Sequence, residues 1–215
     1  MSRATHKVEQ QDCFLEPATS SDVARTIRRS LFLGHVRRAT TEEEARDHIR
    51  DISRQYADAN HNCWAYRVGY PSVREYYSDA GEPSGSAGKP ILGAILRSGL
   101  THVVVVVTRY FGGIKLGVRG LIDAYSGVTT EALSLAGVRE SRLSSLFRVT
   151  VPYEGYQLLL RRLAPFGVTE SDLFPDFGAS IVFDVAVPRS MEDEVEALFD
   201  GHAKRGLLLA WERRS

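Results

Sequence analysis

Side chains that could transfer protons lie in three polar stretches of the chain. Asp79 and Glu82, three residues apart, each carry a carboxylate that could act as a general base. His61 is polar but lies in a segment that is otherwise typical of a buried strand. If the stretches meet in the fold, His61, Asp79 and Glu82 are the candidate catalytic residues. The three stretches are 61–66, 78–90 and 108–120.

The stretch 78–90, SDAGEPSGSAGKP, is rich in Gly, Pro and Ser and predicts a loop that leads into a helix. Lys89 lies near the start of that helix, where free amide groups and the helix dipole favour an anion. The loop is not a nucleotide P-loop, because Pro83 and Pro90 occupy the positions of its first glycine and its metal-binding Ser or Thr. Two interpretations remain open: an anion-binding site, and a rigid structural turn capped onto the helix.

A second glycine-rich junction follows the next expected strand, with glycines at 112, 113, 117 and 120. This spacing differs from the G-x-G-x-x-G fingerprint of dinucleotide-binding proteins. A basic middle within a neutral chain favours an anion-binding surface over bases that only solvate helix ends. Between 83 and 122 there is no acidic residue, and the basic ones are Lys89, Arg97, Arg109, Lys115 and Arg119. The predicted binding residues are Asn62, Ser84, Gly85, Lys89, Arg109, Tyr110, Gly112, Gly113, Lys115 and Arg119.

Cys63 is expected on the same strand face as His61, because side chains alternate along a strand. A Cys–His pair is one route to a nucleophile, but a reactive thiolate needs an electropositive environment. We therefore favour a structural role for Cys63. The six histidines are scattered and the two cysteines form no paired motif, so the sequence predicts neither a metal site nor a cofactor.

The stretch 101–136 must position these side chains, and the expected fold is organised around it. It opens with consecutive valines, Val103 to Val107, which are typical of a strand buried on both faces. After the glycine turn, apolar residues spaced as one helical stripe predict a helix that ends near Gly137. The stripe consists of Leu121, Tyr125, Val128, Ala132 and Leu135. Further strands are expected at 30–39, 60–69 and 73–77, with a helix after Thr41.

From about residue 141 the pattern changes, which predicts a second domain. The expected order is strand, helix, strand, strand, helix, strand, the βαββαβ order of a ferredoxin-like domain. Its third element is expected at 167–173, its second helix is expected to be capped by Ser190, and its last strand is expected at 207–211. The sequence therefore predicts an α+β fold with two domains, 13–143 and 146–213.

The composition of the whole chain limits the classes of function. Lys+Arg and Asp+Glu each number 27 in 215 residues, so no global field attracts polyanions. The N-terminal sequence lacks the apolar core of a signal peptide, and no apolar run approaches the ~20 residues that span a bilayer. We expect a soluble cytoplasmic protein with no membrane partner.

Three sequence blocks, in order, resemble the signature of the YigZ/IMPACT family. They are HNCWAY from residue 61, SDAGEPSGSAGKP from residue 78, and TRYFGGI from residue 108 followed by LG and GL. The resemblance implies an N-terminal domain similar to the second domain of a small-subunit ribosomal protein and to domain IV of elongation factor G. It implies a ferredoxin-like C-terminal domain similar to domain V of the same factor.

The resemblance also implies a translation-associated regulatory protein, because the eukaryotic branch of the family regulates translation through a large partner protein. The expected partners are the ribosome, RNA or a translation-factor-associated protein. The competing hypothesis is an enzyme that acts on a small or phosphate-bearing substrate; we favour the binding protein. Ala80 and Ser86 depart from the family pattern, which commonly has Asp and Thr at these positions. The departure at Ala80 weakens an argument from paired carboxylates, whereas the departures at Lys115 and Arg119 strengthen an anion-binding surface.

Overall fold

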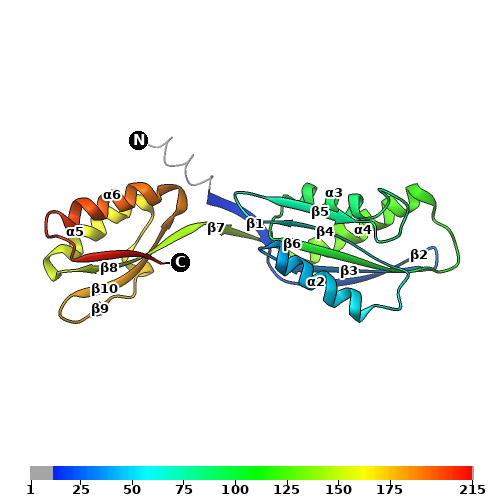
Figure 1. Ribbon diagram of the computed structural model, residues 1–215, viewed down its shortest axis with the longest axis horizontal. Coiled ribbons are helices and arrows are strands. Elements are labelled where there is room, and N and C mark those ends of the chain that lie inside the picture. The colour runs from blue at the N-terminus through cyan, green and yellow to red at the C-terminus, as the bar shows by residue number, and fades with distance from the viewer. Residues whose placement is uncertain (1–11, 215) are drawn as a thin grey trace. The chain divides into compact units, whose positions relative to one another are not determined.

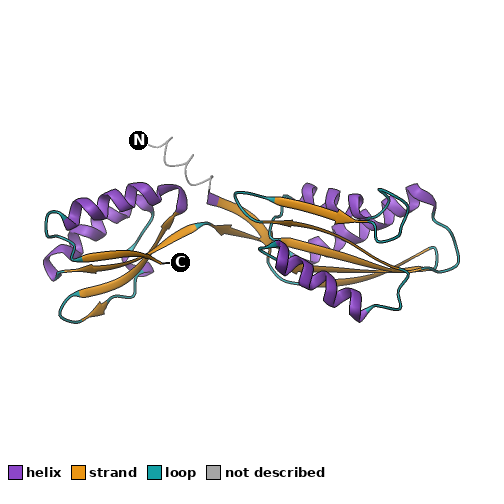
Figure 2. Ribbon diagram, viewed as in Figure 1, coloured by secondary structure: helices purple, strands orange, loops and turns teal. Residues whose placement is uncertain are grey.

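The computed structural model describes residues 12–214, which form two compact units (Figure 1). The N-terminal unit spans Phe14–Ser141, and the C-terminal unit combines 142–214 with residues 12–13. Both units combine helices with antiparallel strands (Figure 2), so the predicted α+β class is confirmed. Within the described residues, no helix has both the length and the apolar character needed to cross a membrane.

The N-terminal unit is built on one antiparallel sheet with the spatial strand order β2-β3-β6-β4-β5. A separate two-stranded sheet pairs β1 with β7. The elements are β1 (Cys13–Pro17), β2 (Ser21–Ile27), β3 (Ser30–Arg38), α2 (Glu42–Gln55), β4 (His61–Val68), β5 (Arg74–Ser78), α3 (Gly88–Ser98), β6 (Val103–Tyr110), α4 (Gly117–Ala136) and β7 (Val138–Arg142).

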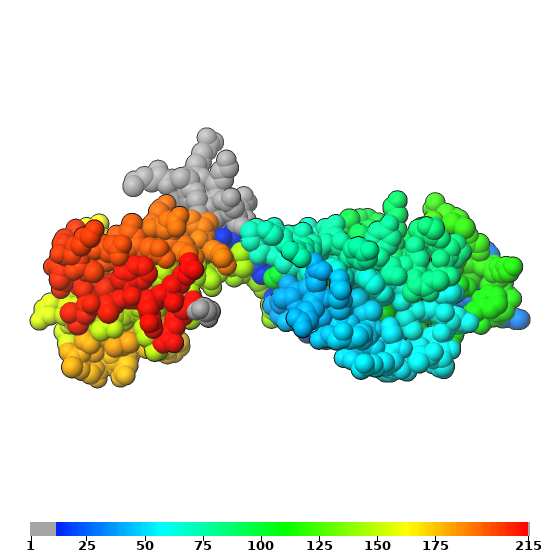
Figure 3. Space-filling view, viewed as in Figure 1, coloured from blue at the N-terminus to red at the C-terminus, as the bar shows by residue number. Residues whose placement is uncertain are grey.

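The valine strand β6 lies in the middle of this sheet, between β3 and β4. Val103, Val105 and Val107 pack in one core with residues of α3 and α4. Val104 and Val106 point to the opposite face and pack with residues of α2, the light-blue helix on the near face in Figure 3. The prediction of a strand buried on both faces is therefore confirmed.

Glu16, on β1, is a buried carboxylate surrounded by hydrogen-bond donors. Its Oε1 accepts from the Ser141 hydroxyl and from Arg139 Nη2, both at 2.6 Å. Its Oε2 accepts from Arg38 Nε at 2.8 Å and lies 3.1 Å from His102 Nδ1. Burial raises the pKa of Glu16, but these hydrogen bonds outweigh burial and lower the pKa to about 2. Glu16 therefore holds β1, β3, β7 and the segment before β6 together as an ionised group.

The C-terminal unit has the ferredoxin-like order that the sequence predicts. Its sheet is antiparallel, with the spatial order β11-β8-β10-β9. Along β10, Ile181, Phe183, Val185 and Val187 are buried and alternate with more exposed neighbours, which places the core on one face of the sheet. The elements are β8 (Ser144–Val151), α5 (Tyr153–Leu163), β9 (Asp176–Phe177), β10 (Ile181–Pro188), α6 (Glu192–Ala203) and β11 (Ala210–Arg214).

Several local predictions for this unit are wrong. The segment 167–173 contains the 3₁₀ turn Glu170–Asp172, and the second strand is the two-residue β9 beyond it. Ser190 does not cap α6, because its hydroxyl donates to the Asp12 carboxylate instead. The last strand begins at Ala210, three residues later than predicted. In the N-terminal unit, β1, β2 and β7 were not predicted.

Candidate functional site

A cleft of about 480 Å³ opens where β6 ends and the chain turns into α4. It brings together the three predicted stretches, because His61 from β4, Glu82 from the loop before α3 and Arg109 from β6 all line it. Lys115 from the glycine turn adds a fourth ionisable side chain. We call this hollow the cleft. Its remaining lining residues are Asn60, Pro83, Phe111, Leu116, Gly117, Val118 and Leu121.

An ion pair between two buried residues, Arg109 and Glu82, forms part of the cleft wall. Arg109 Nη1 donates to Glu82 Oε1 at 2.6 Å, and the Tyr125 hydroxyl of α4 donates to the same oxygen at 2.8 Å. Burial raises the pKa of Tyr125, and the neighbouring Cys63 and Glu82 raise it further, so the phenol stays a neutral donor. Because Glu82 accepts two buried hydrogen bonds, it anchors this wall of the cleft.

Arg109 has contacts on several sides. Its Nη2 donates to the Ser30 hydroxyl at 3.4 Å. Its guanidinium carbon lies 5.5 Å from the ring centroids of both Phe32 and Phe111, a distance at which cation–π attraction operates. Among the described residues, its Nε is buried without a hydrogen-bond partner. Arg109 is therefore held at the cleft with one donor atom, Nε, unpaired among the described residues.

His61 is partly buried at the side of the cleft. Its Nδ1 lies 3.0 Å from the Ala80 carbonyl oxygen, and its Nε2 lies 3.9 Å from Glu82 Oε1. Cys63, two residues further along the strand, is fully buried, with its Sγ 2.9 Å from the Asp79 carbonyl oxygen. Burial raises the pKa of the Cys63 thiol to about 12, so the thiol stays protonated at neutral pH. This supports a structural role for Cys63.

The Asp79 carboxylate does not line the cleft but closes its own loop. Its Oδ2 accepts from the Gly85 amide at 2.8 Å. Its Oδ1 accepts from the Ala87 amide at 3.0 Å and from the Gly88 amide at 2.8 Å. These amides lie at the start of α3, so the chain's own carboxylate takes the place of the predicted external anion. The geometry favours the structural-turn interpretation of this loop.

Eight of the ten predicted binding residues lie outside the cleft. Four of them are Gly85, Gly112, Gly113 and Arg119, and the other four lie on β4, on β6 or in the 78–90 stretch. The side chain of Asn62 faces away from that of His61 and joins β4 to β6, because its Oδ1 accepts from the Thr108 hydroxyl at 2.6 Å. Tyr110 likewise alternates with Arg109, and its hydroxyl donates to Asp58 at 2.8 Å. The other two are Ser84 and Lys89, both exposed.

Gly112 allows two parts of the backbone to approach closely. A Cβ at this position would lie 2.0 Å from the carbonyl group of Arg29, in the turn between β2 and β3. The Gly112 amide also donates to the Ser30 hydroxyl at 3.2 Å. Gly113 has a φ of 84°, a conformation that other residues adopt only with strain. The glycine turn therefore rests directly on the β2–β3 hairpin.

The cations around this turn differ in whether they form ion pairs within the described residues. Lys115 is exposed, lines the cleft and makes no ion pair within residues 12–214. Arg119 lies outside the cleft, and its Nε donates to Asp123 at 3.2 Å. The β2–β3 hairpin adds Arg28 and Arg29, both exposed and, in the described part of the chain, without an ion pair. Consecutive residues with φ of 44° and 66° form this turn, for which Asn-Gly would be the less strained choice.

Sequence reasoning missed several residues of this site. Tyr125 was assigned only to an apolar helical stripe, although a buried tyrosine usually needs a partner for its hydroxyl, and this signal could have found it. Asn60 fixes the turn, because its Oδ1 accepts from the Phe111 amide at 2.7 Å. Arg28 and Arg29 carried no signal, since only the hairpin brings them beside Gly112.

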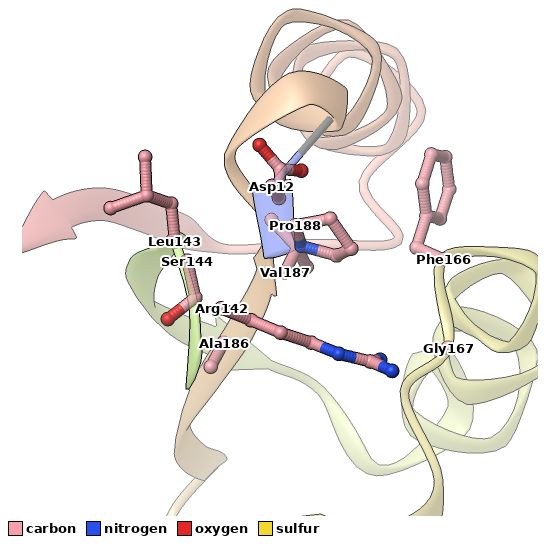
Figure 4. A pocket seen from close by; sticks show the side chains of 9 residues that line it. All are labelled: Asp12, Arg142, Leu143, Ser144, Phe166, Gly167, Ala186, Val187 and Pro188. Atoms are coloured by element: carbon pink, nitrogen blue, oxygen red, sulfur yellow. The ribbon is translucent and has the colours of Figure 1, made fainter. Parts of the chain in front are cut away.

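A second, smaller cavity of about 170 Å³ lies within the C-terminal unit. Figure 4 shows the side chain of Arg142 extending across it towards Gly167. No predicted site residue lines this cavity. Among residues 12–214, no group of three or more His, Cys, Asp and Glu side chains is arranged to hold a metal ion.

Comparisons with known proteins find relatives in one family, and one of these relatives matches most of the chain. The family model described as the Impact N-terminal domain matches residues 28–133. The chain is 31% identical over 201 residues to IMPACT family member YigZ of Escherichia coli (strain K12), covering 92% of this chain and 97% of that protein. It is 42% identical over 127 residues to IMPACT family member YvyE of Bacillus subtilis (strain 168), but this match covers 59% of this chain and only 58% of YvyE. A crystal structure described as that of an hypothetical protein superposes with a TM-score of 0.65 and 27% identity, over 95% of this chain and 97% of that one.

Proposed function

Because the chain belongs to the IMPACT family, we propose that it is a translation-associated regulatory protein that binds ribosomal RNA through its N-terminal unit. Regulation of translation is what the family resemblance implies for the eukaryotic branch. Only contact with the translation machinery is carried over to this chain, because the eukaryotic route depends on a large partner protein. A protein partner on the ribosome is the alternative outcome of the test below.

One observation carries the proposal: free cations surround an exposed aromatic ring at one end of the five-stranded sheet. Arg28, Arg29 and Lys115 are exposed and form no ion pair within the described residues, and the Phe111 side chain beside them is 46% exposed. We call these four residues the basic rim. Cations that contact phosphates together with an aromatic ring that stacks on bases are the usual means of binding single-stranded RNA.

Two features of the backbone hold the residues of the basic rim in place. Gly112 places the Phe111–Lys115 turn against the backbone of Arg29, so cations from two distant parts of the chain lie at one edge. The hairpin keeps two arginines in the left-handed region, at a cost of about 1 kcal/mol or more for each residue. A neutral overall charge does not oppose binding, because the attraction comes from a local cluster.

Co-sedimentation with ribosomes and their separated subunits, at low and raised salt, tests the proposal. The double variant Arg29→Glu/Lys115→Glu should lose saturable, salt-sensitive binding at least about tenfold, because two phosphate contacts become repulsive. The matched control is Arg161→Glu/Arg162→Glu, the same change of charge on exposed residues of the C-terminal unit. Equal binding by both double variants would remove the basic rim from the proposal, and binding by neither variant nor wild type would remove the function.

The convergence of His61, Glu82 and Arg109 on one cleft supports a second candidate, an enzyme acting on a phosphate-bearing small molecule. His61 could transfer a proton there, while Glu82 is better suited to hold Arg109 in place. Screening phosphate-bearing metabolites for consumption by the wild-type protein tests this candidate. Turnover that survives in His61→Gln would exclude His61 as the acid or base.

A further inference from the structure

We propose that the cleft holds the phosphorylated end of a single-stranded RNA, with the terminal phosphate at the start of α4 and its base against Phe111. This inference rests on the proposed function and names the ligand of the same surface. The chemistry recognised is a nucleoside monophosphate group. A free nucleotide would offer the same chemistry, so the experiment below separates the two sources.

The start of α4 supplies the phosphate half of the site. This helix runs for 20 residues from Gly117, and Leu116 at its N-cap position makes no side-chain hydrogen bond to its first turn. Neither is there an acidic residue in that turn. Gly117 and Lys115 both line the cleft, so exposed amides and a free ammonium group meet at one place. Amides and cations at a helix start bind phosphate groups.

The unused donor of Arg109 points to the same ligand. Arg109 is only 5% exposed and lines the cleft, yet its Nε has no hydrogen-bond partner among the described residues. Buried donors in folded proteins nearly always have an acceptor, so such an atom calls for an explanation. Because Nη1 and Nη2 already donate to Glu82 and Ser30, the guanidinium is fixed in place, and Nε is its remaining donor atom without an acceptor within residues 12–214.

The other side of the cleft suits a base. The Phe111 ring is 46% exposed, and Val118 and Leu121 continue the apolar lining. The Arg109 guanidinium carbon lies 5.5 Å from the Phe111 ring centroid, within the range of cation–π attraction. An aromatic ring binds any base by stacking. A volume of about 480 Å³ falls in the range of small-molecule sites and leaves room for about one nucleotide.

The cleft favours an end of a strand over its middle. Its inner wall consists of buried side chains, Glu82, Leu116 and Leu121, so a strand cannot pass through it. A terminal phosphate carries about −1.5 to −2 charges at neutral pH, more than an internal one, and benefits more from Lys115 and the helix start. Arg28 and Arg29 then lie beside Gly112, where the following phosphates can meet them.

Fluorescence anisotropy on the full chain tests the inference with a short oligouridine in three forms: unphosphorylated, 5′-phosphorylated and 3′-phosphorylated. One phosphorylated form should bind at least about tenfold more tightly than the unphosphorylated RNA, because it adds charge-assisted hydrogen bonds. This preference should vanish in Lys115→Gln, whereas Phe111→Ala, which removes the ring that stacks on the base, should weaken the binding of all three RNAs. Both the preference and the affinity should persist in the matched controls Lys204→Gln and Phe174→Ala, which change exposed residues of the same types in the C-terminal unit.

Each of the other outcomes would overturn a different part of this proposal. Equal affinity for all three RNAs would refute the end-binding site while leaving RNA binding intact. Uridine monophosphate that binds as tightly as the phosphorylated RNA would make the occupant a free nucleotide and remove the RNA. Binding of none of these probes would refute this inference, and co-sedimentation with ribosomes would then decide the proposed function separately. Circular dichroism of Lys115→Gln and Phe111→Ala confirms that each exposed-site variant still folds.

Discussion

Replacing Glu16 with Gln should destabilise the N-terminal unit in a way that depends on pH. The substitution keeps the shape of the side chain and removes its charge. The buried amide would then carry no negative charge to offset the donors Arg38, Arg139 and His102, which all approach Glu16 within 3.1 Å.

The pKa of Glu16 falls from 4.5 to about 2 in the folded chain. Each unit of pKa corresponds to about 1.4 kcal/mol, so the ionised carboxylate contributes about 3 kcal/mol at neutral pH. Because the folded pKa lies below the unfolded one, this stability is fully present above pH 4.5 and is lost as the pH falls towards 2. At about pH 3, less than half of the contribution should remain.

Urea unfolding followed by tryptophan fluorescence measures this effect in one unit at a time. The chain has two tryptophans, Trp64 in the N-terminal unit and Trp211 in the C-terminal unit. In a Trp211→Phe background, Trp64 alone reports, and Glu16→Gln should lower the midpoint by about 1–3 M urea at pH 7. The control Glu131→Gln makes the same change at an exposed ion pair with Arg25 and should alter stability by less than about 1 kcal/mol.

Two results would refute the argument. If Glu16→Gln and Glu131→Gln lowered the midpoint equally at pH 7, the network around Glu16 would not stabilise the fold. If the difference between wild type and Glu16→Gln were the same at pH 7 and near pH 3, the lowered pKa of Glu16 would be wrong even if the network mattered.

Three further predictions concern the cleft and its surroundings. Gly112→Ala should lower the free energy of unfolding by more than about 2 kcal/mol, because its Cβ would lie 2.0 Å from the Arg29 carbonyl group. Gly113→Ala places its Cβ in open space and should lower it by only about 1–2 kcal/mol, through backbone strain. Urea unfolding checks both, and an equal cost would contradict the backbone contact. Tyr125→Phe should lower the free energy of unfolding by about 1–2 kcal/mol, because Glu82 loses a buried hydrogen-bond donor. An unchanged midpoint of urea unfolding would show that this hydrogen bond does not stabilise the fold. In a Cys13→Ser background, Cys63 should resist a thiol reagent at about pH 8 until urea unfolds the chain, because its pKa is raised to about 12; rapid labelling of the native protein would contradict this.

The sequence predicts elements best where apolar patterns are strong. The valines of β6 predicted a strand buried on both faces because a short run of five consecutive β-branched side chains favours a buried strand over a helix. By contrast, β2 has the sequence SDVARTI and is mostly exposed, so it forms through pairing with β3 rather than through an apolar pattern of its own. The same holds for the two residues of β9. Strands held mainly by a partner's backbone leave little trace in composition.

The three predicted stretches meet at one cleft, but several of the predicted side chains do not line it. The glycines at 112 and 113 marked the turn, because Gly112 has no room for a Cβ and Gly113 has a positive φ that strains other residues. Whether His61 or Asn62 points into the cleft depends on the pleat of β4, which the sequence does not reveal. The roles of Asp79 and Glu82 also depend on the backbone path of their loop, which turns one carboxylate inward on amides and the other towards Arg109.

The Asp79 loop has a consequence for anion chemistry at α3. The carboxylate that accepts from three amides is a ligand tethered to its own receptor, so its effective concentration is on the order of millimolar or higher. Dissolved phosphate must compete with this tethered group and should not displace it. Removing the tether in Asp79→Gly would free the amides, and added phosphate or sulfate should then restore part of the lost thermal stability. Chemical rescue of this kind would show that the loop retains the geometry of an anion receptor and uses it to stiffen the start of a helix.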